Sequence, residues 1–171
     1  WIAFLDGDDE WMPTFLEKIA DTTWRYPSER IFGTLSKHVN NETGEIHSFI
    51  PVGLENKTQL IDCFLSPNLL PHTSAIVTKK EVLKELSHNY EVFPERMRAC
   101  EDWACFHRLG MSNKIVIVGK LLGIRNNNVR GQITSRSEAE RLELNSDVIR
   151  YYELLLDHWS NCKLKDSHFE V

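Results

Sequence analysis

The sequence predicts an α/β domain in which a mixed β-sheet is flanked by helices. Short apolar or β-branched runs, typical of strands, occur at residues 2–5, 31–39 and 73–78. Residues 13–26 and 99–111 instead carry apolar side chains at helical spacing. Strands that alternate with helices along a chain are the pattern of an α/β fold.

The composition is that of an ordinary globular protein. The 171 residues are enough for one domain, and a 42% hydrophobic share is enough to fill its core. The net charge is −5 and the basic residues are scattered, so we expect no nucleic-acid partner. Because no apolar run is long enough to span a membrane, we expect a cytoplasmic protein that could be peripheral to the inner face of the membrane.

The four cysteines, Cys63, Cys100, Cys105 and Cys162, lack the spacing of a metal site. Cys100 and Cys105 are five positions apart, which on a helix points them away from each other. A zinc site that includes His107 is therefore not expected. We interpret the cysteines as reduced thiols in the core of a cytosolic protein.

The beginning of the chain, WIAFLDGDDEWMP, is the most informative stretch. Its apolar run leads directly into Asp6, Gly7, Asp8 and Asp9, which predicts a buried parallel strand with acids at its carboxyl end, where α/β sheets bind ligands. A divalent cation would relieve the repulsion among these carboxylates. Oxygen ligands of this number favour Mg²⁺ or Mn²⁺. Alternatively, the acids only stabilise the start of the following helix.

The same acidic stretch is also compatible in part with two other motifs, an EF-hand loop and a phosphatase motif. An EF-hand loop that begins at Asp6 is excluded, because Trp11 occupies its glycine position. The Asp-x-Asp pair also resembles that of a haloacid-dehalogenase-type phosphatase, in which a threonine or valine usually stands where Glu10 stands here. That phosphatase remains the alternative. Since the chain opens with Trp1 in what looks like an interior strand, we also expect that an upstream part of the fold has been cut away.

The remaining elements follow in order. A helix over 13–26 ends at Pro27. Strands at 31–39 and 45–52 flank a turn and form a hairpin. A short helix is expected over 57–65, a strand over 73–78 and a helix over 79–86. His72 lies where a loop meets the 73–78 strand, so it could face a pocket, although a surface histidine is the alternative.

The second half begins with a helix over 99–111, in which Trp103 is expected to be buried. Glu101 and Asp102 fall in its first turn, where acids commonly complement the helix dipole. Strands are expected at 114–118 and 121–125, broken by Gly119. A polar loop over 126–135 follows. A final helix then starts near Ser137, whose spacing to Glu140 fits a capping box.

The order of these features resembles the family 2 glycosyltransferases with the GT-A fold. Four pieces carry the resemblance: FLDGDDEWMP, HTSAIVTKKEVL, FPERMRACEDWACFHRLG and GIRNNN. The resemblance implies a partial GT-A fold, which is a Rossmann-like nucleotide-diphospho-sugar transferase fold. Residues 1–136 would be the C-terminal portion of its catalytic domain, on the metal and acceptor side, and residues 137–171 a C-terminal helix and tail.

The resemblance also assigns the donor side of the site. Asp8 would be the metal ligand of the Asp-x-Asp motif, with Asp6 on the nucleotide ribose or a metal-bound water. Arg125 and Arg130 would contact phosphate. The implied cofactors are Mn²⁺ or Mg²⁺ and a nucleotide-sugar donor such as a UDP-sugar. The family often has a histidine near the diphosphate at the position of Asn127, so a second protein ligand from that position is not expected.

On the acceptor side, the resemblance makes Asp102 the catalytic base, with Glu101 touching the acceptor. A base on the face opposite the leaving group implies inversion at the anomeric carbon. His72 and Trp103 would lie on the acceptor side. The implied activity is sugar transfer to a carbohydrate or lipid-linked acceptor in polysaccharide or bacterial cell-envelope biosynthesis. A non-catalytic sugar- or nucleotide-binding module is the remaining alternative.

The resemblance does not cover the family's amino-terminal half, which binds the base and the ribose. We therefore expect the 171 residues alone to bind nucleotide weakly and to be inactive, although the intact protein would be an enzyme. A truncated sheet would also expose an edge, which favours self-association into a homo-oligomer.

Overall fold

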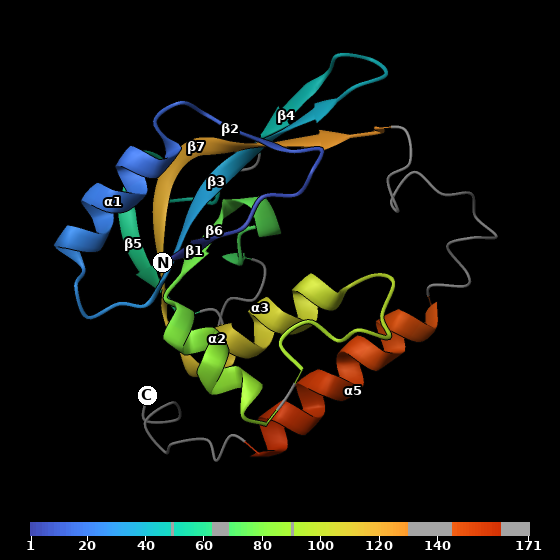
Figure 1. Ribbon diagram of the computed structural model, residues 1–171. Helices are drawn as coiled ribbons and strands as arrows, with labels where there is room; N and C mark the ends of the chain where they lie inside the picture. The colour runs from blue at the N-terminus through green and yellow to red at the C-terminus, as the bar shows by residue number, and fades with distance from the viewer. Residues whose placement is uncertain (49, 63–68, 90, 130–144, 162–171) are drawn as a thin grey trace.

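A mixed, curled sheet lies at the centre of the molecule, and helices flank it (Figure 1). The computed structural model describes residues 1–48, 50–62, 69–89, 91–129 and 145–161. Over these residues the sheet has seven strands. Its main path runs in the order β1 (Ile2–Ala3), β6 (Ile76–Thr78), β3 (Ile31–Asn40), β7 (Ile115–Asn127) and β2 (Glu10–Trp11). Off this path, β4 (Ile46–Ser48) pairs with β3, and β5 (Thr58–Ile61) pairs with β7.

Helices cover both faces of the sheet. The helix α1 (Phe15–Arg25) packs on one face through Phe15 and Ile19, against Phe32, Val77 and alternate residues of β7. On the other face, α2 (Lys80–Ser87) and α3 (Glu101–Ser112) pack against the side chains that point the opposite way from the same strands. Because both faces are buried, these central strands read as continuous apolar runs.

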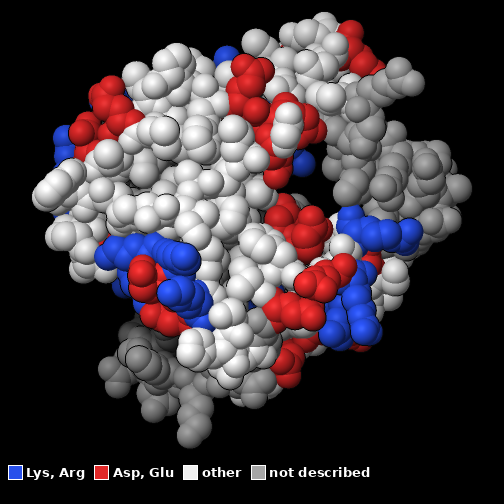
Figure 2. Space-filling view, viewed as in Figure 1, with Lys and Arg blue, Asp and Glu red and all other residues white. Residues whose placement is uncertain are grey.

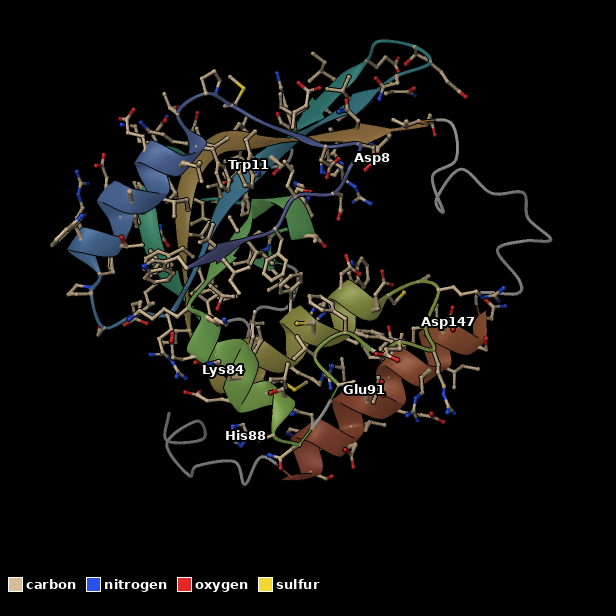
Figure 3. The ribbon with its side chains drawn as sticks, in the orientation of Figure 1. Asp8, Trp11, Lys84, His88, Glu91 and Asp147 are labelled. Carbon is tan, nitrogen blue, oxygen red and sulfur yellow. The ribbon has the colours of Figure 1, made fainter. Side chains whose placement is uncertain are left out.

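The helix α5 (Asn145–Asn161) lies outside this layer and packs along α3. Its buried Tyr151 joins a small cluster with Met97 and Ala104. At its start, the Asp147 carboxylate accepts a hydrogen bond of 3.0 Å from the backbone N–H of Arg98 (Figure 3). This contact ties α5 to the loop that leads into α3. No helix among the described residues is long and apolar enough to cross a membrane.

The direction of the strands decides where the polar loops lie. Strands β3 and β7 are parallel, and β6 runs antiparallel to both β3 and β1. Strands β1, β3 and β7 therefore run in one direction and end at the same edge of the sheet. Because β6 runs the other way, its beginning lies at that edge.

Several sequence predictions are confirmed. The helices expected over 13–26, 79–86 and 99–111 correspond to α1, α2 and α3, and the hairpin is formed by β3 and β4. The final helix is observed from Asn145; its predicted start at Ser137 lies outside the described residues.

Three predicted elements differ from the structure. The strand at the beginning of the chain is only partly buried, and its hydrogen-bonded neighbour β6 is antiparallel, not parallel. The prediction of a helix over 57–65 is wrong for its first part, because Thr58–Ile61 form a strand along the edge of β7. Pairing with an open strand edge overrides the weak helical spacing of this short stretch.

The two strands expected around Gly119 are a single strand, β7. Gly119 does not break it but lets another backbone approach closely. Its N–H donates to the Lys57 carbonyl and its own carbonyl accepts from the Asn56 N–H, both at 2.7 Å. A Cβ at Gly119 would lie 1.7 Å from the Leu54 carbonyl oxygen. Asn126 and Asn127, expected in a loop, also continue β7, because the strand still pairs with β3 there.

Candidate functional site

The opening loop crosses the edge where β1, β3 and β7 end. The chain leaves β1 beside β6 and re-enters the sheet as β2, which pairs with Gly123 and Ile124 of β7. Residues 4–9 must therefore pass over the ends of the strands between them (Figure 1). At the same edge, a single 3₁₀ turn at Thr73–Ala75 immediately precedes β6. The acids of the loop thus meet a short polar segment from the middle of the chain.

Asp9 fixes this loop from inside. Its side chain is only 4% exposed. It accepts hydrogen bonds from the Ser74 hydroxyl at 2.6 Å and from the Asn126 backbone N–H at 3.0 Å. The Asn126 side-chain amide also donates to the Asp8 carbonyl oxygen at 2.7 Å. Because Asp9 is both buried and hydrogen-bonded in this way, it is a structural anchor of the loop that carries Asp6 and Asp8.

Asp102 lies in the first turn of α3, as the sequence predicts. Its Oδ2 accepts a hydrogen bond of 2.5 Å from the Thr73 hydroxyl, and its Oδ1 accepts one of 2.8 Å from the Trp103 backbone N–H. Glu101 is half-buried in the same turn. The residue before them, Cys100, adopts a left-handed backbone with φ of 64°. The orientation of the Asp102 carboxylate is therefore set from two sides.

The charges of the two acidic segments interact with each other. Burial raises the pKa of Asp6 to about 6, and the negative charges of Asp9, Asp102 and Asp8 add to this effect, while Arg125 opposes it. Asp6 is nevertheless exposed in part, so its carboxyl group remains accessible. Figure 2 shows acidic side chains on both sides of a hollow between the sheet edge and α3. In Figure 3, Asp8 lies on the sheet side of this space.

The acidic side chains of the opening loop could supply only part of the coordination sphere of a metal ion. Among the described residues, no three His, Cys, Asp or Glu side chains are placed to hold a metal ion together. Asp6 and Asp8 offer oxygen donors. Burial is the main cause of the raised pKa of Asp6, and the repulsion from nearby carboxylates that adds to it would fall beside a bound cation. These features fit a hard divalent ion such as Mn²⁺ or Mg²⁺, provided that a bound substrate supplies further ligands.

A cavity of about 360 Å³ adjoins the Thr73 side of this space. Three of the predicted site residues, His72, Trp103 and Arg125, line it. Apolar side chains form part of its wall, from Leu35, Pro51, Leu69, Leu70, Pro71 and Phe106, and polar ones the rest, from Thr34, Ser36, His38, Thr73 and His107. A cavity that combines apolar walls with polar groups can hold a small molecule.

His72 is a neutral residue of this cavity. Burial lowers its pKa to about 4, and the positive charges of Arg125 and His38 add to the effect. Its Nε2 lies 2.6 Å from the Ser36 hydroxyl, and its Nδ1 lies 3.7 Å from Asp9. Trp103, expected to be buried, is 53% exposed, because it sits at the start of α3 beside the cavity and not on the face that packs on the sheet.

The predicted residues thus fall into two groups. Asp8, Asp102 and Arg125 lie near enough to Asp6 for their charges to act on its pKa, and the cavity brings Arg125 together with His72 and Trp103. Arg130 lies outside the described residues. Asn127, at the position of the family's histidine, uses its carbonyl oxygen to accept the Asn41 N–H at 3.0 Å.

Sequence reasoning missed four residues that shape the site: Asp9, Thr73, Ser74 and Asn126. The run of acids contained Asp9, but no spacing rule distinguishes an inward carboxylate from an outward one. Thr73 and Ser74 read as the first residues of a strand. A hydroxyl pair beside a proline-rich loop was the one signal that could have marked them.

No protein-family model matches this chain, and a search of curated proteins found no match either. The resemblance to GT-A glycosyltransferases therefore stays a prediction from the sequence.

Proposed function

We propose that this chain is part of the catalytic domain of a metal-dependent, inverting glycosyltransferase with a partial GT-A fold. Its donor would be a nucleotide-diphospho-sugar such as a UDP-sugar, and its acceptor a hydroxyl of a carbohydrate or lipid-linked molecule. One observation carries the proposal: the loop with Asp6 and Asp8 and the helix start with Asp102 meet at one turn, where Ser74 bonds Asp9 of the loop and Thr73 bonds Asp102. In the sequence, 94 positions separate Asp8 from Asp102.

Each residue has a physical role in this proposal. Asp8, with Asp6, would hold the divalent ion, which supplies Lewis-acid stabilisation of the charge on the leaving diphosphate. Asp102 would accept the proton of the attacking hydroxyl. Each of its carboxylate oxygens accepts one hydrogen bond in the structure, and a carboxylate oxygen has a further lone pair for a substrate hydroxyl. Proton removal opposite the leaving group would give inversion.

The cavity supports an acceptor site beside Asp102. The neutral His72 ring would form part of its wall, with Nε2 paired to the Ser36 hydroxyl at 2.6 Å. The exposed indole of Trp103 offers an apolar platform at the rim. We place the reaction in polysaccharide or cell-envelope biosynthesis on the basis of the family resemblance alone.

The test uses the natural protein that contains this chain, Mn²⁺ and a panel of UDP- and GDP-sugars. We expect metal-dependent release of the nucleoside diphosphate, and Asp8→Asn and Asp102→Asn should each lower kcat by about 10²–10⁴-fold. The exposed Asp21 on α1 provides a matched control, and Asp21→Asn should retain activity. Full activity of Asp102→Asn would contradict the proposed base. Metal-dependent cleavage of phosphomonoesters would favour the phosphatase alternative, and sugar-nucleotide binding without turnover the binding module.

The 171 residues alone should bind nucleotide weakly, because the resemblance assigns the base and ribose contacts to a part of the fold outside them. Isothermal titration calorimetry of UDP and a UDP-sugar into this chain, with Mn²⁺ present, checks this expectation. Micromolar affinity would contradict it.

A further inference from the structure

We propose that the dipeptide Thr73–Ser74 is a positioning element that holds the Asp102 carboxylate and the Asp6–Asp9 loop at a fixed separation. The inference deepens the proposed function and rests on it for the importance of that separation. The contacts that define the element belong to the structure alone.

The 3₁₀ turn explains why two neighbours can serve opposite sides. Successive side chains in a 3₁₀ helix point about 120° apart. Thr73 accordingly donates its hydroxyl proton to Asp102 on α3, whereas Ser74 donates to Asp9 in the opening loop. The turn stands at the sheet edge because β6 runs against its neighbours. The two acidic segments are thus each hydrogen-bonded to one of two adjacent residues of the same turn.

Ser74 holds the loop at three points. Its hydroxyl donates to Asp9 Oδ2 at 2.6 Å and accepts the Asp6 backbone N–H at 3.0 Å. Its carbonyl oxygen accepts the indole N–H of Trp11 at 2.6 Å. Ser74 is fully buried, so water cannot replace these partners without rearrangement. The hydroxyl therefore fixes the path of the backbone that presents Asp6 and Asp8.

Thr73 instead acts on the orientation of one carboxylate. Its hydroxyl bonds Oδ2 of Asp102, while the Trp103 N–H bonds Oδ1, and together they fix the rotation of the group. Among the described residues, the charge of Asp102 also acts on Asp6, His72, Cys100 and Cys105. In the proposed reaction, a misplacement of about 1 Å between base and donor costs roughly 10²-fold in rate.

The first test needs no enzymatic activity. In ¹⁵N NMR spectra of the 171-residue chain, Thr73→Val should shift the amides of Asp102 and Trp103 and leave residues 6–9 unchanged. Ser74→Ala should shift residues 6–9 and leave 101–103 unchanged, while the Trp11 indole N–H, which bonds the retained Ser74 carbonyl, should move little. Thr73→Ser keeps the hydroxyl and should resemble the wild type. If either variant perturbs both sets equally, the division of roles is wrong. If Ser74→Ala does not fold, Ser74→Cys takes its place, because the thiol is close to serine in size but is a weak hydrogen-bond donor and acceptor.

The second test is a split of kinetic parameters in the natural protein. Thr73→Val should lower kcat about tenfold or more, with the half-saturating Mn²⁺ concentration unchanged. Ser74→Ala should raise that concentration about 10–100-fold, as expected when a support behind a metal ligand is lost. Equal loss of both parameters in both variants would overturn the inference. Absence of any transfer by the wild type would refute the proposed function, while the NMR result would still decide the positioning role.

Discussion

Asp6 is expected to lower the stability of the folded protein at neutral pH. Its pKa rises from 3.8 to about 6 on folding, so the folded state holds a proton that the unfolded state has already released. The destabilisation by Asp6 is absent below pH 3.8, grows as the pH rises from 3.8 to about 6, and is complete above about pH 6. Replacement of Asp6 by Asn removes the charge and should therefore stabilise the protein above pH 6 but not near pH 3.8.

The size of this effect follows from the shift. A rise from 3.8 to about 6 corresponds to at most about 3 kcal/mol. Because Asp6 is partly exposed, solvent screens its interactions, and we expect a gain of only about 1 kcal/mol for Asp6→Asn at pH 7.5.

Urea unfolding at pH 4 and pH 7.5 measures the difference directly. Asp21→Asn, which changes an exposed acid on α1, serves as the control and should show less than about 0.5 kcal/mol at either pH. The reasoning is refuted if Asp6→Asn is no more stable than the wild type at pH 7.5, or if its gain is the same at pH 4. Addition of Mn²⁺ should stabilise the wild type more than the variant, since only the wild type keeps both carboxylates.

Three further predictions concern the backbone and His72. Cys100→Gly should stabilise the protein by up to about 1 kcal/mol in urea, because φ of 64° strains any residue with a Cβ; a loss of stability would contradict this. Gly119→Ala should destabilise by more than about 3 kcal/mol, because its Cβ would meet the Leu54 carbonyl at 1.7 Å, whereas Gly7→Ala, with no atom within 4 Å, should change stability by less than about 1 kcal/mol. The ¹⁵N shifts of the His72 ring should show a neutral imidazole down to about pH 5, since its pKa is about 4; a midpoint near 6.5 would show that the ring is not buried as described.

The sequence predicted the elements that have strong local signals. The helices α1, α2 and α3 have clear apolar periodicity, and the β3–β4 hairpin has a turn rich in Asn and Gly. Sequence-based prediction failed where long-range contacts determine the local structure. Residues 58–61 form a strand because they pair with the edge of β7. Gly119 continues a strand because the backbone at residues 54–57 lies against it. Neither partner is adjacent in the sequence.

The candidate site shows the same division. Residue types and the family resemblance indicated Asp6, Asp8 and Asp102, whose charges interact in the structure. The supports behind them were not predictable, because the roles of Asp9, Thr73 and Ser74 depend on a strand that runs against its neighbours. No periodicity in the sequence encodes the direction in which a strand is inserted.

Strand β6 also determines the order in which this region can assemble. Thr78 pairs with Ile2 on one side and with Ile31 on the other, so β1 joins the sheet only through β6 among the described residues. The opening loop cannot be fixed at both ends until a segment more than seventy positions away has docked. Such distant pairing closes slowly, so native contacts around Asp6 should be among the last to form during refolding.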